Sequence, residues 1–229
     1  MSAVSSPDAQ TGRFRGLLTR TLSAAVLGPL LFAAIWFGFP WIDLVAAIAA
    51  PIMVLEWIRL TRGRPVARVM AIAYAVAAVV SLLWLRHQPG TGRETVIWIV
   101  ACVIAADTGA YFLGSLAGGM KLAPSISPSK TWSGLIGGMC WAAVVSALLG
   151  LVFQLGETLS LALIGAGLAV VEQLGDLLES AAKRRAGVKD SGRLIPGHGG
   201  LLDRVDGLIA ILVVVGLVRL LTGGDWPWG

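Results

Sequence analysis

The chain has 229 residues, of which 56% are hydrophobic and 14% charged, and its mean hydropathy is +0.81. This composition excludes an ordinary soluble domain and indicates a protein whose main solvent is the lipid bilayer. The formal net charge of +5 requires no nucleic-acid partner, because basic loops beside a membrane of anionic lipid account for it.

Seven apolar runs follow one another along the chain, each near the roughly 20 residues that cross a bilayer as a helix. We therefore predict an all-α, polytopic integral membrane protein with about seven transmembrane helices, within a range of six to nine. The second and the last runs are the shortest. The runs cover residues 21–39, 42–58, 66–85, 94–117, 133–153, 158–178 and 207–222.

The sequence contains no internal repeat, soluble domain or long linker, so residues 21–222 are predicted to form a single transmembrane catalytic domain. Residues 1–20 form a cytoplasmic N-terminal tail in this interpretation, and residues 223–229 a short C-terminal tail. The first run resembles a signal peptide, but its length and the spans after it favour a retained helix. Cys102 and Cys140 lie inside predicted spans and have no metal-ligand spacing, so they are interpreted as packing residues.

The basic residues predict the orientation, because Lys and Arg favour cytoplasmic loops near helix ends. With a cytoplasmic N-terminus, fifteen of the eighteen Lys and Arg residues fall on the cytoplasmic side, all except Arg86, Arg93 and Arg219. The two polar segments that carry the candidate chemistry then also face the cytoplasm.

The first polar segment begins inside the fourth run, where Asp107 lies near mid-span, the most costly depth for a charge. Asp107 therefore faces a polar cavity, pairs with a basic residue, or is a protonated structural acid. Pro124 and Pro128 stiffen the loop that follows, and its Lys, Ser and Thr side chains suit a triphosphate or a lipid phosphate. The candidate phosphate-binding residues of this loop are Lys121, Ser125, Ser127, Ser129, Lys130 and Thr131.

The sixth run ends in a stripe of charged residues. Glu172, Asp176, Glu179 and Lys183 are spaced i, i+4, i+7 and i+11, which places all four on one side of a helix. Carboxylates inside a span are costly, so the stripe is expected to face protein or water. A salt-bridged helix end is the alternative, and for Glu179, which pairs with Lys183 at i,i+4, it explains the pattern equally well.

The second polar segment, from Ser180 to Asp206, combines basic residues, carboxylates and glycines that suit a Mg²⁺-bound phosphate ester. Asp203 and Asp206 share one face of a helical turn and can share an ion, although Asp206 is explained equally well as a helix cap. Arg204 between them holds a phosphate or neutralises the pair. His198, in a glycine-rich turn, donates to a phosphate, moves a proton, or is structural.

The two polar segments resemble those of one known family. The second is similar in its spacing to the C-terminal signature of the phosphatidate cytidylyltransferase (CDP-diacylglycerol synthase) family. The first, DTGAYFLG followed by KLAPSISPSKTW, resembles the other polar block of that family. The matching residues of the C-terminal signature are Ser180, Lys183, Arg184, Lys189, Asp190, Pro196, His198, Gly199, Gly200, Asp203, Arg204 and Asp206.

This resemblance implies an enzyme of phospholipid biosynthesis in a bacterial-type inner membrane, with its active site facing the cytoplasm. It would condense CTP with phosphatidate to CDP-diacylglycerol and pyrophosphate, and because the lipid phosphate is already anionic, no general base is needed. Mg²⁺ is the implied cofactor, with a second cation such as K⁺. The expected metal ligands are Asp176, Asp203, Asp206 and Glu172; the expected catalytic residues are Asp107, Lys130, Lys183, His198 and Arg204. The resemblance adds Arg184, Lys189, Asp190, Gly199 and Gly200 to the substrate-binding residues.

Several alternatives stay open at this point. An isoprenoid-lipid cytidylyltransferase and a CTP-dependent lipid kinase belong to the same wider class, and an ion-coupled transporter to a different one. The sequence departs from the usual family pattern at Ser115, Gly119, Ser133 and Ser191, which bears on substrate preference. Gly134 and Gly138 form a GxxxG pair, which predicts a helix-packing contact and hints at a homodimer.

Overall fold

The structure is a computed structural model that describes residues 25–192, 194 and 199–223. The predicted tail at residues 1–20 lies outside the described residues, as do residues 224–229, Arg193 and His198.

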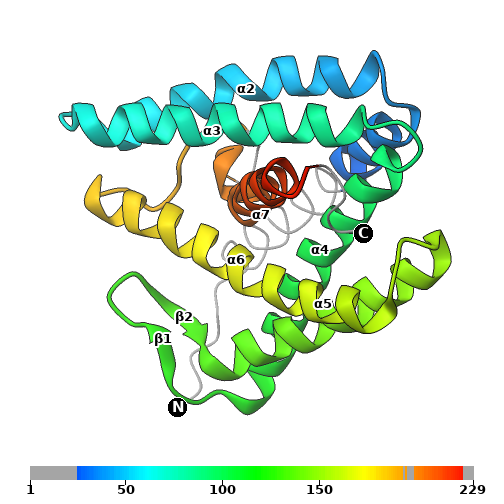
Figure 1. The fold of residues 1–229 in the computed structure, drawn as a ribbon. Helices are drawn as coiled ribbons and strands as arrows, with labels where there is room; N and C mark the ends of the chain where they lie inside the picture. Colours follow the sequence, from blue (N-terminus) through cyan, green and yellow to red (C-terminus); the bar gives the residue numbers. More distant parts are fainter. Residues whose placement is uncertain (1–24, 193, 195–198, 224–229) are drawn as a thin grey trace, which may run out of the picture.

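Within the described residues the chain forms seven helices and one two-stranded ribbon (Figure 1). In chain order the elements are an N-terminal helix (Ala25–Phe37), α2 (Trp41–Leu60), α3 (Pro65–Arg86), α4 (Gly92–Ala117), β1 (Lys121–Ala123), β2 (Ser127–Thr131), α5 (Trp132–Phe153), α6 (Thr158–Arg185) and α7 (Leu202–Leu221). The prediction of an all-α polytopic membrane protein is confirmed, with the short ribbon as an addition.

Five of these helices, α2 to α6, are long and apolar enough to cross a membrane. Helix α7 overlaps the last predicted span, but Asp203, Arg204 and Asp206 near its beginning and Arg219 near its end leave it without a long uncharged stretch. The N-terminal helix is shorter than a span within the described residues. The predicted second span, although short, corresponds to a full helix because α2 continues to Leu60.

Helices α4 and α5 approach each other at a row of glycines. A Cβ atom added at Gly109 would lie 2.5 Å from the carbonyl oxygen of Gly137, and one at Gly138 would lie 2.9 Å from that of Ala106. Gly134 belongs to the same row. The GxxxG pair therefore packs inside the chain, against α4, and provides no contact for a second copy.

Replacing Gly109 with valine should lower the stability by about 1–3 kcal/mol, because the added carbons enter a contact between two backbones. We expect a lower melting temperature in detergent. Gly167→Ala is the matched control, since a Cβ at Gly167 has no atom within 4 Å and alanine suits a helix better than glycine. Equal melting temperatures for the two variants would contradict the described packing.

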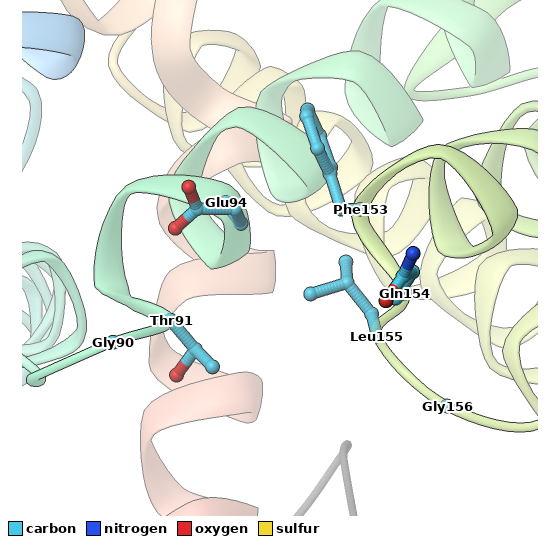
Figure 2. A pocket seen from close by; sticks show the side chains of 7 residues that line it. All are labelled: Gly90, Thr91, Glu94, Phe153, Gln154, Leu155 and Gly156. Atoms are coloured by element: carbon cyan, nitrogen blue, oxygen red, sulfur yellow. The ribbon is translucent and has the colours of Figure 1, made fainter.

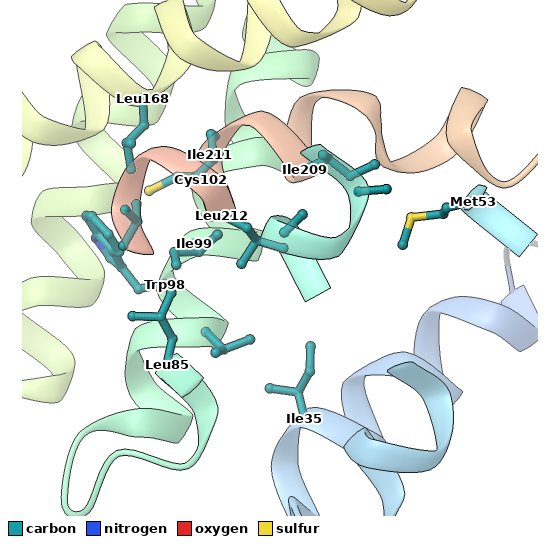
Figure 3. Close-up of a cluster of buried hydrophobic side chains, with 14 of the residues drawn as sticks. Ile35, Met53, Leu85, Trp98, Ile99, Cys102, Leu168, Ile209, Ile211 and Leu212 are labelled. Carbon is teal, nitrogen blue, oxygen red and sulfur yellow. The ribbon is translucent and has the colours of Figure 1, made fainter. Parts of the chain in front are cut away.

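The hydrophobic core surrounds α7 (Figure 3). Ile211 and Leu212 of α7 belong to one buried cluster with Leu85 of α3 and Trp98 of α4. Apolar side chains from α2 and α6 complete this cluster. Because α7 is held on several sides, the acidic residues at its beginning are fixed relative to α6.

The ribbon lies between α4 and α5, where the sequence predicted only a polar loop. Its strands are antiparallel, with Lys121 opposite Thr131. Thr131 is the N-cap of α5 and its hydroxyl accepts from the Gly134 N–H at 3.0 Å, while the Ser133 hydroxyl donates to the carbonyl oxygen of Gly118. These contacts fix the position of Lys130, one residue before the cap.

Three connections gather at one end of the bundle. Arg64, in the turn between α2 and α3, donates from Nη2 to the carbonyl oxygen of Arg185 at 3.5 Å. Arg184 donates from Nε to the carbonyl oxygen of Ile126, in the turn of the ribbon, at 3.3 Å. Figure 1 shows the α2–α3 turn, the ribbon and the end of α6 on the same side. Both predicted polar segments therefore meet at this end.

Candidate functional site

Three carboxylates form a cluster where α6 crosses the beginning of α7. Asp176 and Glu179 of α6 and Asp206 of α7 each offer an oxygen, and these oxygens lie within 4.8 Å of one another. The helices come this close because α6 has a glycine at the crossing: a Cβ at Gly175 would lie 2.8 Å from the Asp206 carbonyl oxygen. The predicted stripe on α6 thus faces protein, with Glu172 4% and Glu179 1% exposed.

Two lysines from different elements pair with the cluster. Lys130 of β2 forms an ion pair with Asp176, and Lys183 of α6 pairs with Glu179 and, at 2.7 Å, with Asp203. Burial alone would lower the pKa of Lys130, but the nearby negative charge of Asp176 outweighs it and raises this pKa above its ordinary value. Lys130 is therefore a fixed positive charge at neutral pH.

The cluster has the donor set of a divalent cation site. Glu179 Oε1 is buried and has no hydrogen-bond partner among the described residues, while Oε2 pairs with Lys183. An unpaired buried carboxylate oxygen is costly, and oxygen ligands are those that Mg²⁺ prefers. The three side chains consequently fit such an ion. In the described part of the chain this is the one group of three with ligand spacing, so a second cation such as K⁺ gains no support.

Asp203 has a different environment from the cluster. Its Oδ1 accepts from Lys183 at 2.7 Å, and its Oδ2 accepts from the backbone N–H and the hydroxyl of Ser191, both at 2.9 Å, and from the Gly200 N–H at 2.8 Å. Both oxygens are thus engaged with protein donors. The expected metal ligands were Asp176, Asp203, Asp206 and Glu172, whereas the geometry groups Asp176 and Asp206 with Glu179.

A cavity of about 390 Å³ adjoins the cluster on the side of Lys130. Asp107, Lys130 and Gln173 contribute polar groups to its wall, together with hydroxyls of the ribbon. Gln173 is 3% exposed, and its Nε2 has no hydrogen-bond partner within the described residues. The cavity therefore contains an unused donor beside a fixed positive charge. Gln173 could not be identified from the sequence, because an uncharged amide beside Glu172 is not part of any charged pattern.

Asp107 and Ser115, two positions that the sequence singled out, also line this cavity. Asp107 lies beside Glu172 of α6 and lines the cavity, as the alternative of a polar cavity predicted. Ser115, a departure from the usual family pattern, lines the same cavity from α4.

Most of the remaining predicted residues are exposed. Thr131 is buried as the α5 cap, Ser127 is half-buried, and Gly199, with φ +85°, packs against Asp203. The structure does not describe His198. The exposed predicted residues are Lys121, Ser125, Ser129, Arg184, Lys189, Asp190 and Arg204.

A second cavity, of about 350 Å³, lies at the opposite end of the bundle (Figure 2). Thr91, Glu94 and Gln154 supply its polar side chains, from the beginning of α4 and the turn after α5. Its carboxylate, Glu94, already pairs with Arg93 at 2.6 Å. Its lining residues include neither the acidic cluster nor a lysine, so the candidate site is the one at the other end.

Comparisons with known proteins point the same way. The model of the cytidylyltransferase family matches residues 63–221. Over 169 residues the chain is 42% identical to the phosphatidate cytidylyltransferase of Brucella suis. The aligned region covers 74% of this chain and 61% of that protein. Over 208 residues it is 32% identical to the phosphatidate cytidylyltransferase of Rickettsia conorii, covering 88% of this chain and 90% of that protein. The chain thus spans about six-tenths of the length of the Brucella relative and most of the Rickettsia one.

Proposed function

The chain belongs to the cytidylyltransferase family, and from this premise we propose that it transfers the cytidylyl group of CTP to phosphatidate, giving CDP-diacylglycerol and pyrophosphate. The observation that carries the proposal is the cluster of three buried and half-buried carboxylates, which pairs with two lysines from separate elements. Such a site at one end of a membrane bundle suits a reaction between a nucleotide and a lipid phosphate.

In this reaction an oxygen of the lipid phosphate attacks the α-phosphorus of CTP. A new P–O bond forms, the bond to the bridging oxygen of the β-phosphate breaks, and pyrophosphate leaves with the electron pair. The attacking oxygen is already anionic, so no residue has to remove a proton, and catalysis consists of positioning and charge stabilisation. Lys130 and Lys183 are the groups that we assign to the negative charge of the phosphates.

We assign Mg²⁺ to Asp176, Glu179 and Asp206, on the strength of their mutual distances and the unpaired oxygen of Glu179. When bound, the ion neutralises phosphate charge and holds the reacting groups in place. Glu172 and Asp203, the other two predicted ligands, flank the cluster. Asp203 acts mainly by holding Lys183 at 2.7 Å.

The cavity beside Lys130 is the position that we assign to the nucleotide. Lys130 donates to the phosphates, and Gln173 Nε2 supplies a donor that the described residues leave unused. Thr131 contributes indirectly, as the cap that holds the end of β2. The exposed basic residues of the second polar segment, among them Arg184, Lys189 and Arg204, attract both anionic substrates.

We place this end of the bundle on the cytoplasmic side of a bacterial-type cell membrane, where CTP is present. The distribution of Lys and Arg supports this orientation. Cysteines at Ser125 and Val188, in a background without Cys102 and Cys140, should escape a membrane-impermeant thiol reagent that is applied outside intact cells. Both positions are exposed, whereas Ser191 is buried and would report nothing.

Pro89→Cys is the control on the other side, because Pro89 is exposed in the turn between α3 and α4. It should react with the external reagent, and all three cysteines should react after the membrane is permeabilised. Labelling of Ser125→Cys and Val188→Cys from outside, with Pro89→Cys protected, would reverse the orientation.

The proposed reaction is tested with purified protein in detergent micelles that contain phosphatidate. Pyrophosphate release should require CTP, phosphatidate and Mg²⁺ together. Replacing phosphatidate with an isoprenyl phosphate tests the related lipid class. Release with the isoprenyl phosphate alone would move the substrate to that class, and no release with either lipid would contradict the proposal.

A further inference from the structure

A buried carboxylate that lies outside both polar segments contacts the segment between α6 and α7 and the beginning of α7. Glu56 lies in α2 and is 3% exposed, and it precedes the segment that matches the family, which begins at residue 63. Its Oε1 accepts from the Leu201 N–H at 3.0 Å, and its Oε2 accepts from the Leu202 N–H at 2.8 Å and the Ser191 hydroxyl at 3.1 Å. Neither the reaction nor the cation site described above uses Glu56.

The first effect of these contacts is on α7. The first N–H groups of a helix have no partner inside it, and in α7 the residue at the N-cap position, Leu201, makes no side-chain cap. Glu56 supplies that cap from another helix, with a negative charge that suits the positive end of the helix dipole. It thus determines where α7 begins, and Asp203 and Asp206 lie in the first turns.

The second effect is on Asp203. The Ser191 hydroxyl lies 3.1 Å from Glu56 Oε2 and 2.9 Å from Asp203 Oδ2, so its single proton is placed between two carboxylates. The loop backbone follows Glu56 closely, because a Cβ at Gly192 or at Gly200 would lie 2.5 Å from Glu56 Oε1. A larger residue at either position would push the carboxylate away.

We propose that Glu56 is a positioning residue for the active site: it caps α7 and, through Ser191, sets the orientation of Asp203 and hence of Lys183. This inference rests on the proposed function for its catalytic part. Its structural part, that Glu56 holds the segment between α6 and α7 in place, can be tested independently of any reaction.

The experiment compares Glu56→Gln with Glu94→Gln. Both replace a carboxylate on a helix with its amide, and Glu94 lies at the far end of the bundle. In Glu56→Gln an NH₂ group replaces one acceptor oxygen and meets a backbone or hydroxyl donor. We expect its kcat to fall about 10–100-fold, as for other residues that orient the side chains of a site without contacting the substrate. The KM for CTP should stay within about twofold, because the cavity is unchanged. Glu94→Gln should match the wild type.

Limited trypsin digestion provides the readout without substrate. Lys189 is exposed in the segment that Glu56 holds, and Arg62 is exposed in the α2–α3 turn. Glu56→Gln should increase cleavage after Lys189 several-fold and leave cleavage after Arg62 unchanged. Unchanged cleavage at Lys189, or an equal increase at both sites, would overturn the proposal. If the wild type is inactive, the proposed function fails and this digestion still decides the role of Glu56.

Glu56→Asp keeps the charge but is one methylene shorter, so it should recover part of both kcat and protection at Lys189. If Glu56→Gln does not yield folded protein, Glu56→Asp is compared with Glu94→Asp in the same two assays. A Glu56→Asp variant with the same kcat and the same cleavage after Lys189 as Glu94→Asp would overturn the proposal.

Discussion

Replacing Asp176 with asparagine should lower kcat by about a hundredfold or more, since one preorganised charge at a reacting phosphate is typically worth that much. The substitution removes the negative charge that pairs with Lys130 and weakens an oxygen donor of the acidic cluster. The side chain keeps its size and can still accept from the Ser180 hydroxyl. The variant should therefore fold and have a melting temperature near that of the wild type. Steady-state kinetics at saturating Mg²⁺, with a melting curve in the same detergent, measure both effects.

Asp43→Asn is the matched control. Asp43 lies at the opposite end of the bundle, 3.3 Å from His87 Nε2, and has no role in the proposed chemistry. Its variant should retain the activity of the wild type. If Asp176→Asn were nearly as active as Asp43→Asn, the acidic cluster would not be the reaction site.

The second large effect is expected for Lys130→Ala, with a loss in kcat of about 10²–10³-fold. Lys130 is a half-buried positive charge that pairs with the cluster and lines the cavity. If its interaction were equally strong in the ground and transition states, only the apparent affinity for CTP would fall. We expect kcat to fall, because the leaving pyrophosphate gains negative charge as the bond breaks. A CTP concentration series distinguishes the two patterns.

Arg62→Ala removes an exposed positive charge at the same end of the bundle and should have little effect. Lys130→Arg is informative as well, because a guanidinium keeps the charge but cannot occupy the same space as an ammonium. Equal and small effects of Lys130→Ala and Arg62→Ala would reduce Lys130 to a charge that only sets orientation.

The spans and the charged stripe of α6 could be predicted because each depends on local spacing. Apolar runs of sufficient length form helices in a bilayer regardless of their neighbours. A carboxylate every three or four residues defines one helix face, so the burial of Glu172 and Glu179 follows from the pattern.

The partners of these residues could not be predicted in the same way. Glu56 is one of two acids in a mostly apolar helix, and its contact with Ser191 joins residues 135 positions apart. Whether Asp203 or Glu179 lies beside Asp176 depends on the crossing of α6 and α7 and on the path of the loop between them. The ribbon was missed because Pro124 and Pro128 indicated an irregular loop, whereas one proline lies in its turn and the other is exposed in β2.

The most direct test of the cytidylyl transfer follows the fate of each phosphate of CTP. Purified protein is incubated with Mg²⁺, phosphatidate and CTP that carries a radioactive label at either the α- or the γ-phosphorus. The α-label should appear in the lipid and the γ-label in pyrophosphate, because the bond between the α-phosphorus and the leaving group is the one that breaks. Transfer of the γ-label to the lipid would identify a kinase instead, and absence of both labels from lipid and pyrophosphate would contradict the proposed enzyme altogether.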